Sequence, residues 1–182
     1  MSVLSDLSLR TMLDCRRLLI DALGENAIQP ASVDLTLGPI LLVPGPGQHV
    51  NFKEGVLPDK HRQVPIHKEP YCLKPGEAVL GATHEAVTIP DDLVGFVEGR
   101  SSIARVFMQI HAAGLLDPGY HGHPTLEIVN HGPHTIWLNA GDPICQLVLL
   151  RLTTRCERPY GSEGLGSRYQ GDVMPSGARR TA

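Results

Sequence analysis

Glycine and proline interrupt this chain every few residues, and that limits what it can fold into more than any other feature of the sequence. The 182 residues include 19 glycines and 15 prolines, and both residue types are unfavourable inside helices. From Leu73 onward, short apolar runs alternate with turn signals at a spacing of about ten residues. This spacing is typical of a sandwich or a jelly-roll-like barrel. We therefore expect one domain that is mainly β.

A helix is expected only near the N-terminus. Residues 5–23 carry a broken apolar face that ends at Gly24, and Ser5 is placed to cap the helix. Residues 29–38 alternate apolar and polar side chains and predict a half-buried strand. Residues 44–70 have weak periodicity, and we interpret them as a long surface excursion or loose hairpin with no assigned chemistry. Further strands are expected at 78–82, 86–89, 94–98, 125–129, 136–138 and 144–152.

Charge and cysteine content exclude several classes of partner. A net charge of −3 and a pI near 6.3 provide no basic field for nucleic acid, and no twenty-residue apolar run predicts a membrane span. The four cysteines are scattered without close pairing, which predicts free thiols and a cytoplasmic protein. We expect a β domain over residues 1–158. The Gly-rich tail at 159–182 is then either a disordered end or a flexible flap that orders over a ligand.

Two polar stretches stand out within this β pattern. The first is Gly-Arg-Ser-Ser-Ile-Ala-Arg at residues 99–105. Backbone N–H groups around Ser101 and Ser102 can face an anion. Arg100 and Arg105 supply charge and forked donors beside them. This stretch is therefore a candidate loop over phosphate.

The second stretch pairs a carboxylate at a turn, Asp117, with Glu127 on the strand that follows. Because side chains alternate along a strand, Thr125 and Glu127 share one face. If Leu126 and Ile128 fill the core, Glu127 points into a cleft or into solvent. A solvated strand carboxylate is the structural alternative to a catalytic one.

Four histidines, at positions 121, 123, 131 and 134, are candidates for a metal site, although exposed loop histidines are the commoner case. Zinc-dependent base deaminases need a His or Cys with a nearby Glu, followed by Pro-Cys-x-x-Cys. No such spacing occurs in this sequence. Any deaminase chemistry in this chain is therefore expected to proceed without zinc.

Six segments spread over nearly the whole chain carry recognisable motifs. They are Gln-Pro-Ala-Ser-Val-Asp at 29–34, Gly-Arg-Ser-Ser-x-x-Arg at 99–105, Ala-Gly-Leu-Leu-Asp-Pro-Gly at 113–119, Thr-Leu-Glu at 125–127, residues 141–147 and the tail residues 160–170. Together they resemble the dCTP deaminases of the trimeric dUTPase-like superfamily. The resemblance implies a homotrimer of distorted jelly rolls, with active sites at subunit interfaces. It also implies that the tail closes over a Mg²⁺-bound nucleotide.

The resemblance implies roles for individual residues around the base and the sugar. Glu127 would take a proton from a water that attacks C4 of cytosine, and would return protons to N3 and the departing amine. Ser101 and the carbonyl of Ala113 would orient that water. Asp117 would hold the deoxyribose 3′-hydroxyl, and Tyr120 would lie near the sugar.

The same resemblance implies a triphosphate site. Arg100, Ser102 and Arg105 would contact the phosphates, and Arg105 would reach the reacting nucleotide from a neighbouring subunit. The remaining residues expected to bind substrate are Thr125, Leu126, Gln146, Tyr160, Arg168 and Tyr169.

The chain also departs from the family pattern. Residues 112–113 leave one loop a residue short, in a segment that shapes the base pocket and mediates feedback inhibition by dTTP in the family. Leu115 favours the bifunctional branch, and Arg168 replaces a usual Lys. Asp172 stands where a Gln that contacts the base is expected, and it either accepts from a cytosine amine or lies outside the pocket.

The predicted function is hydrolytic deamination of dCTP to dUTP and ammonia, followed in the bifunctional branch by cleavage to dUMP and pyrophosphate. Mg²⁺ is expected with the triphosphate, and dTTP is a candidate inhibitor. Two alternatives stay open. One is a dUTPase-like pyrophosphatase in which Glu127 is incidental, and the other is a nucleotide-binding trimer that has lost catalysis.

Overall fold

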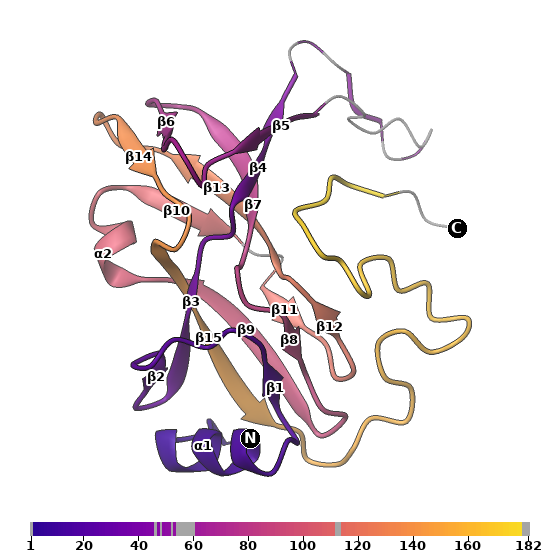
Figure 1. Cartoon of the computed structure of the whole chain (residues 1–182). Coiled ribbons are helices and arrows are strands. Elements are labelled where there is room, and N and C mark those ends of the chain that lie inside the picture. The colour runs from indigo at the N-terminus through magenta and orange to yellow at the C-terminus, as the bar shows by residue number, and fades with distance from the viewer. Residues whose placement is uncertain are drawn as a thin grey trace.

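The computed structural model describes residues 2–45, 47, 49–51, 53, 61–111 and 114–179. Antiparallel strands dominate this part of the chain (Figure 1). In chain order the elements are α1 (Asp6–Asp14), β1 (Leu19–Ile20), β2 (Ile28–Gln29), β3 (Ser32–Thr36), β4 (Ile40–Pro44), β5 (His61–Pro65), β6 (Tyr71–Leu73), β7 (Ala78–Ala82), β8 (Val87–Thr88), β9 (Leu93–Gly99), α2 (Ser101–Ala104), β10 (Met108–His111), β11 (Leu115–Leu116), β12 (His121–Gly122), β13 (Thr125–Asn130), β14 (Ile136–Leu138) and β15 (Pro143–Arg151). The expectation of a mainly β fold is confirmed.

Two five-stranded sheets form the body of the molecule. Their strand orders are β10-β13-β7-β4-β5 and β11-β9-β15-β3-β2, and smaller sheets are formed by β1-β8-β12 and by β14-β6. Apolar side chains from these sheets and from α1 share one buried core. Because sequence neighbours such as β13 and β14 belong to different sheets, the chain crosses between layers as a jelly-roll barrel requires.

The alternation expected for residues 29–38 is present in β3. Val33 and Leu35 are fully buried, whereas Asp34 and Thr36 are half-buried on the other face. This strand lies between β15 and β2, so its apolar face contributes directly to the core. The four cysteines are unpaired, as the sequence predicts.

Leu35→Ala is expected to lower the free energy of unfolding by about 2–5 kcal/mol, because it leaves a cavity at a fully buried position. The matched control is Leu7→Ala, since Leu7 is 73% exposed. Urea unfolding at one protein concentration measures both variants. Equal effects of the two substitutions would contradict the burial assigned to Leu35.

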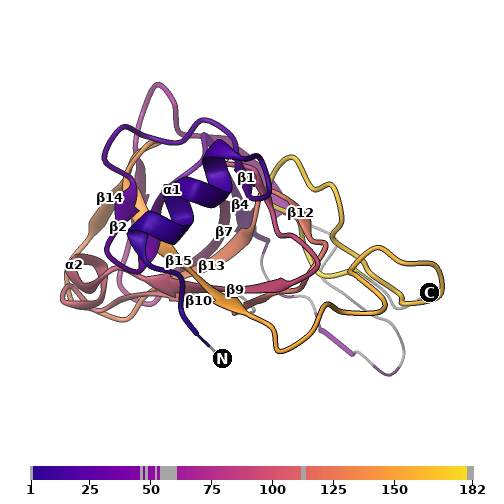
Figure 2. The same cartoon turned by 90° about the horizontal axis from the view of Figure 1, so that it is seen from below.

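The N-terminal helix is shorter than the sequence predicts. The Ser5 Oγ accepts a hydrogen bond from the Ser8 amide at 3.5 Å, as expected for an N-cap. The helix ends at Asp14, not near Gly24, because Arg16 adopts a left-handed φ of 55°. The chain then continues as β1, which pairs with β8. The helix lies across one end of the barrel (Figure 2).

The excursion at residues 44–70 is in part an edge hairpin. Strand β5 pairs with β4 from Ile40↔Pro65 to Pro44↔His61, which adds a strand to one large sheet. The side chains of β5 are half-buried or exposed. The sequence of this strand therefore lacks the alternation of apolar and polar residues that would predict it. Residues 46, 48, 52 and 54–60 lie outside the described residues. In the described part of the chain, no helix is long and apolar enough to cross a membrane.

Candidate active site

A cavity of about 520 Å³ lies between β7, β13, the turn after β11 and the C-terminal tail. Six of the residues predicted to form the site line it, and they are Asp117, Tyr120, Thr125, Glu127, Tyr160 and Tyr169. Asp172 also lines this cavity, so it does not lie outside the pocket. The cavity therefore combines carboxylates and phenols from distant parts of the sequence.

Strand β13 presents Glu127 to the cavity. Burial alternates along this strand, with Leu126 and Ile128 fully buried and Thr125 and Glu127 half-buried on the opposite face. Glu127 pairs in register with Leu80 of β7, and its Oε2 is buried. A carboxylate held at this depth in a sheet is not a simple solvated one. The side chain of Leu126 belongs to the core and does not line the cavity, so its contact with substrate stays a prediction.

The turn that carries Asp117 is tightly packed against the start of the tail. Gly119 has a φ of +87°, and a Cβ at this position would lie 2.5 Å from the Cβ of Pro159. The Tyr160 amide donates to the Pro118 carbonyl at 2.7 Å, and the Tyr120 amide donates to the Asp117 carbonyl at 3.0 Å. A glycine is therefore required to bring Asp117 and the tail together.

Tyr120 and Tyr160 form an aromatic pair at the wall of the cavity. Their ring centroids lie 5.9 Å apart at an interplanar angle of 54°. Burial raises the pKa of the Tyr120 hydroxyl well above its usual range, and the nearby Asp172 and Tyr160 add to this shift. Tyr120 therefore acts at neutral pH as a protonated phenol with an apolar ring.

The tail at residues 159–179 packs against its own domain (Figure 1). The Tyr160 hydroxyl accepts from the amides of Arg168 and Tyr169 at 3.0 and 2.9 Å. The Gln170 side chain bridges two backbone groups, since its Nε2 donates to the Gly119 carbonyl and its Oε1 accepts from the His121 amide. The tail is thus specifically bonded beside the cavity. Its predicted closure over a nucleotide stays a prediction.

Tyr160→Phe is expected to loosen the tail locally, because two backbone donors lose their acceptor at a cost of about 1–3 kcal/mol. Hydrogen exchange of the peptide around Arg168 and Tyr169 should rise. Tyr71→Phe, in β6, is the control for loss of a phenol far from the tail. Unchanged exchange in Tyr160→Phe would show that its hydroxyl does not hold the tail.

The residues predicted to bind phosphate or to orient the water from the same stretch lie elsewhere in the structure. Residues 101–104 form the short helix α2 and not an open loop, which corrects the loop expectation for this stretch. Arg100, Ser101, Ser102 and Arg105 do not line the cavity. Figures 1 and 2 place α2 on the opposite side of the barrel from the tail.

Two further predicted residues, Gln146 and Arg168, do not line the cavity. Arg100 is held by Asp34 through an ion pair of 3.2 Å, and Gln146, on the neighbouring strand β15, accepts from Ser32 at 3.5 Å. Arg168 is exposed and donates to the Arg179 carbonyl at 3.4 Å. Ala113, predicted to orient a water, lies outside the described residues.

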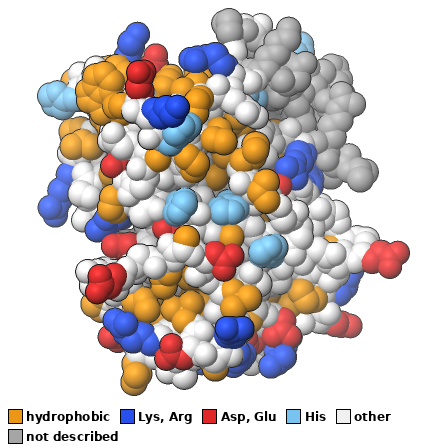
Figure 3. Space-filling model, viewed as in Figure 1, with side chains coloured by type: hydrophobic (Ala, Val, Ile, Leu, Met, Phe, Trp, Pro, Cys, Tyr) orange, Lys and Arg blue, Asp and Glu red, His pale blue; other side chains and the backbone are white. Residues whose placement is uncertain are grey.

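Several histidine side chains lie near one another on the face shown in Figure 3. His121 Nδ1 lies 2.8 Å from Thr88 Oγ1, and His123 Nδ1 lies 3.1 Å from the Thr83 carbonyl oxygen. Among the described residues, no group of three His, Cys, Asp or Glu side chains is arranged to hold a metal ion. The Nδ1 atoms of His121 and His123 are instead within hydrogen-bond distance of oxygen atoms of neighbouring threonines.

The sequence prediction missed part of the cavity lining. His61 and Pro44 come from the excursion, and residues 176–178 come from the end of the tail. The weak hydrophobic periodicity of the excursion is the reason that the sequence does not place His61 and Pro44 at the site. The tail residues lie beyond the last motif of the resemblance, so no sequence signal identifies them.

Fold and site together define a mainly β protein whose cavity combines the carboxylates Asp117 and Glu127 with tyrosines under a C-terminal tail. A family model described as dCTP deaminase-like matches residues 3–152. This chain belongs to that family, which confirms the resemblance drawn from its motifs.

Relatives and one solved structure support this assignment. The chain is 42% identical over 182 aligned residues to a protein of Mycobacterium sp. (strain KMS) named "dCTP deaminase, dUMP-forming", covering 97% of this chain and 95% of that one. It is 41% identical to a protein of the same name from Rhodococcus opacus (strain B4), covering 96% and 94%. The crystal structure of 2′-deoxycytidine 5′-triphosphate deaminase from Agrobacterium tumefaciens has the same fold, with a TM-score of 0.64 and 23% identity over 81% of this chain. This chain spans 47% of the length of that protein.

Proposed function

We propose that this protein deaminates dCTP and then hydrolyses the resulting dUTP, so that its final products are dUMP, ammonia and pyrophosphate. The observation that carries the proposal is the position of Glu127, which enters the cavity from β13, an interior strand of its sheet, beside the Asp117 turn. The names of relatives that are 40–42% identical over nearly the whole chain support the dUMP-forming activity. We place the reaction in pyrimidine deoxynucleotide metabolism in the cytoplasm.

Deamination in this proposal is hydrolytic. The Glu127 carboxylate accepts a proton from a water as its oxygen attacks C4 of cytosine. Protons then pass to N3 and to the exocyclic amine, and the C4–N bond breaks to release ammonia. One carboxylate serves as base and then as acid, which suits a group shielded from bulk water. No zinc is required, because the oriented carboxylate activates the water.

The triphosphate site is completed by a neighbouring subunit in a homotrimer. Arg100, Ser101, Ser102 and Arg105 belong to one chain and the cavity to another, which explains why α2 and the tail lie on opposite sides of a single subunit. Mg²⁺ enters as part of the substrate, bound to phosphate oxygens. Ser101 of the same α2 segment helps to orient the attacking water.

The sugar is selected at the turn after β11. Asp117 accepts a hydrogen bond from the 3′-hydroxyl, and the buried ring of Tyr120 leaves no room for a 2′-hydroxyl. In the second reaction Asp117 activates a water toward the α-phosphate, the bond to the β-phosphate breaks, and pyrophosphate leaves. The same turn thus serves binding and the second hydrolysis.

Incubation with dCTP and Mg²⁺ tests the proposal, with ammonia measured and nucleotides separated from the same sample. Ammonia with dUMP and pyrophosphate is the expected result. Ammonia with dUTP alone would limit the enzyme to deamination, and unaltered dCTP would overturn the proposal. A parallel reaction with dTTP tests it as a feedback inhibitor, for which slower ammonia release is expected.

A further inference from the structure

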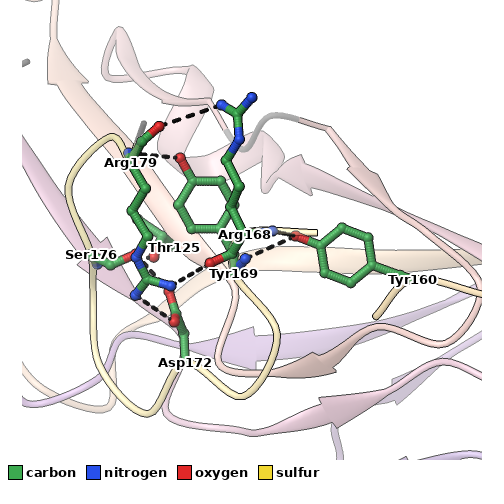
Figure 4. A network of polar contacts seen from close by, with 7 residues as sticks. All are labelled: Thr125, Tyr160, Arg168, Tyr169, Asp172, Ser176 and Arg179. Atoms are coloured by element: carbon green, nitrogen blue, oxygen red, sulfur yellow. Dashed lines mark hydrogen bonds and ion pairs between the residues drawn. The ribbon is translucent and has the colours of Figure 1, made fainter. Parts of the chain in front are cut away.

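Arg179, the last described residue of the tail, contacts Arg168, Tyr169 and Asp172 earlier in the tail (Figure 4). Its guanidinium forms an ion pair with Asp172 at 2.7 Å and also donates to the Arg168 carbonyl. The same group lies over the ring of Tyr169, 5.3 Å from its centroid. The Arg179 amide donates to the Tyr169 hydroxyl at 3.3 Å. One residue therefore contacts the tail through charge, backbone and ring.

Asp172, the partner of this ion pair, is fixed to the domain. Its carbonyl accepts from the His123 amide at 2.8 Å, and a Cβ at Gly122 would lie 3.0 Å from both its backbone N and O. Only 7% of its side chain is exposed, against 43% for Arg179. Asp172 is thus an anchored, buried anion, and Arg179 supplies its cation.

Residues 173–179, which we call the closing segment, also contact the domain through the buried Pro175 and through Gln63 Nε2, which lies 4.0 Å from the Met174 sulfur. Val173 and Met174 are exposed. Ser176 donates from its Oγ to Asp172 at 2.6 Å and from its amide to Thr125 Oγ1 at 3.3 Å. The segment contains no strand or helix. Yet it supplies residues 176–178 to the cavity wall.

We propose that Arg179 is a positioning residue that holds the closing segment over the cavity through Asp172, and that affinity for the nucleotide depends on this contact. The proposal rests on the proposed function for its substrate, but the closing role itself does not require turnover. Without the guanidinium, the buried Asp172 carboxylate loses its counter-charge. The closing segment then moves away so that water can reach that carboxylate.

The test compares Arg179→Gln, Arg179→Lys and Asp172→Asn with the unchanged protein. Hydrogen exchange of the peptide covering 173–179 is measured first, without nucleotide. Arg179→Gln should raise this exchange about tenfold, as expected for a local opening that loses its main contact. Arg179→Lys, which keeps the charge, should recover part of the protection. Wild-type exchange in Arg179→Gln would overturn the proposal.

Steady-state kinetics with dCTP provide the second measurement. Arg179→Gln should raise KM roughly tenfold, the effect of losing a buried charge contact of about 1.4 kcal/mol, with a smaller change in kcat. The control Arg158→Gln removes a tail arginine that donates to the Glu163 carbonyl at 3.0 Å and does not line the cavity, and both constants should stay unchanged. A fall in kcat with unchanged KM would assign Arg179 to the chemistry and overturn a positioning role.

The double variant Asp172→Asn with Arg179→Gln tests the pair itself. If the two residues act through one contact, the double variant should open the closing segment no more than either single variant. If the effects of the two single variants on exchange add up in the double variant, the ion pair does not hold the closing segment, and the proposal is overturned. If wild-type protein does not turn over dCTP, the proposed function fails, while exchange still decides whether Arg179 holds the closing segment.

Discussion

Glu127→Gln is expected to slow ammonia release from dCTP by a factor of about 10²–10⁴, the contribution of a positioned acid–base group. Glutamine keeps the size and the hydrogen-bonding capacity of the side chain but cannot take a proton from water at neutral pH. Binding of dCTP should change little, because the cavity keeps its shape. Ammonia release and calorimetric titration with dCTP measure the two effects separately.

The matched control for this substitution is Glu98→Gln. Glu98 is an exposed strand carboxylate in β9 that does not line the cavity. Its replacement should leave ammonia release at the wild-type rate. An unchanged rate in Glu127→Gln would remove the acid–base role and restore the interpretation of Glu127 as a structural strand residue.

Asp117→Asn is expected to slow the second proposed reaction, hydrolysis of dUTP, while deamination of dCTP continues. Pyrophosphate release should fall by about 10²–10⁴, since the water at the α-phosphate loses its base. Deamination should continue at raised dCTP concentrations, because asparagine still offers an acceptor to the 3′-hydroxyl. The product of the variant should therefore be dUTP, separated from dUMP by ion exchange.

Asp21→Asn controls for loss of an exposed carboxylate outside the cavity, and it should form dUMP normally. If Asp117→Asn still produced dUMP at the wild-type rate, the second hydrolysis would not use Asp117. If it lost ammonia release as well at every dCTP concentration, Asp117 would be needed for deamination too, and the two reactions would not be separated at this residue.

The two substitutions act on neighbouring parts of one cavity, and tertiary structure creates this proximity. Glu127 comes from β13, whose partners β7 and β10 hold it in register. Asp117 comes from a turn that the start of the tail covers, through the contact between Pro118 and Tyr160. Neither environment is a property of the local sequence around the carboxylate.

Local sequence determined the elements that depend on near neighbours. Glycine and proline content predicted the β class, and alternation at residues 125–129 placed Glu127 on the face opposite Leu126, because successive side chains of a strand point to opposite faces. Ser5 marked the start of the helix. The motifs also identified the family that the comparisons support.

Only the tertiary structure decided which of the candidate residues share a cavity. It placed Asp117, Glu127, Tyr160 and Tyr169 together and α2 elsewhere, because strand pairing and tail packing join residues far apart in the chain. It also ended the helix at Asp14, where the left-handed Arg16 leads the chain toward β1 and its pairing with β8. The ion pair between Asp172 and Arg179 is likewise invisible in sequence, because the burial of Asp172 depends on how the tail packs against the domain.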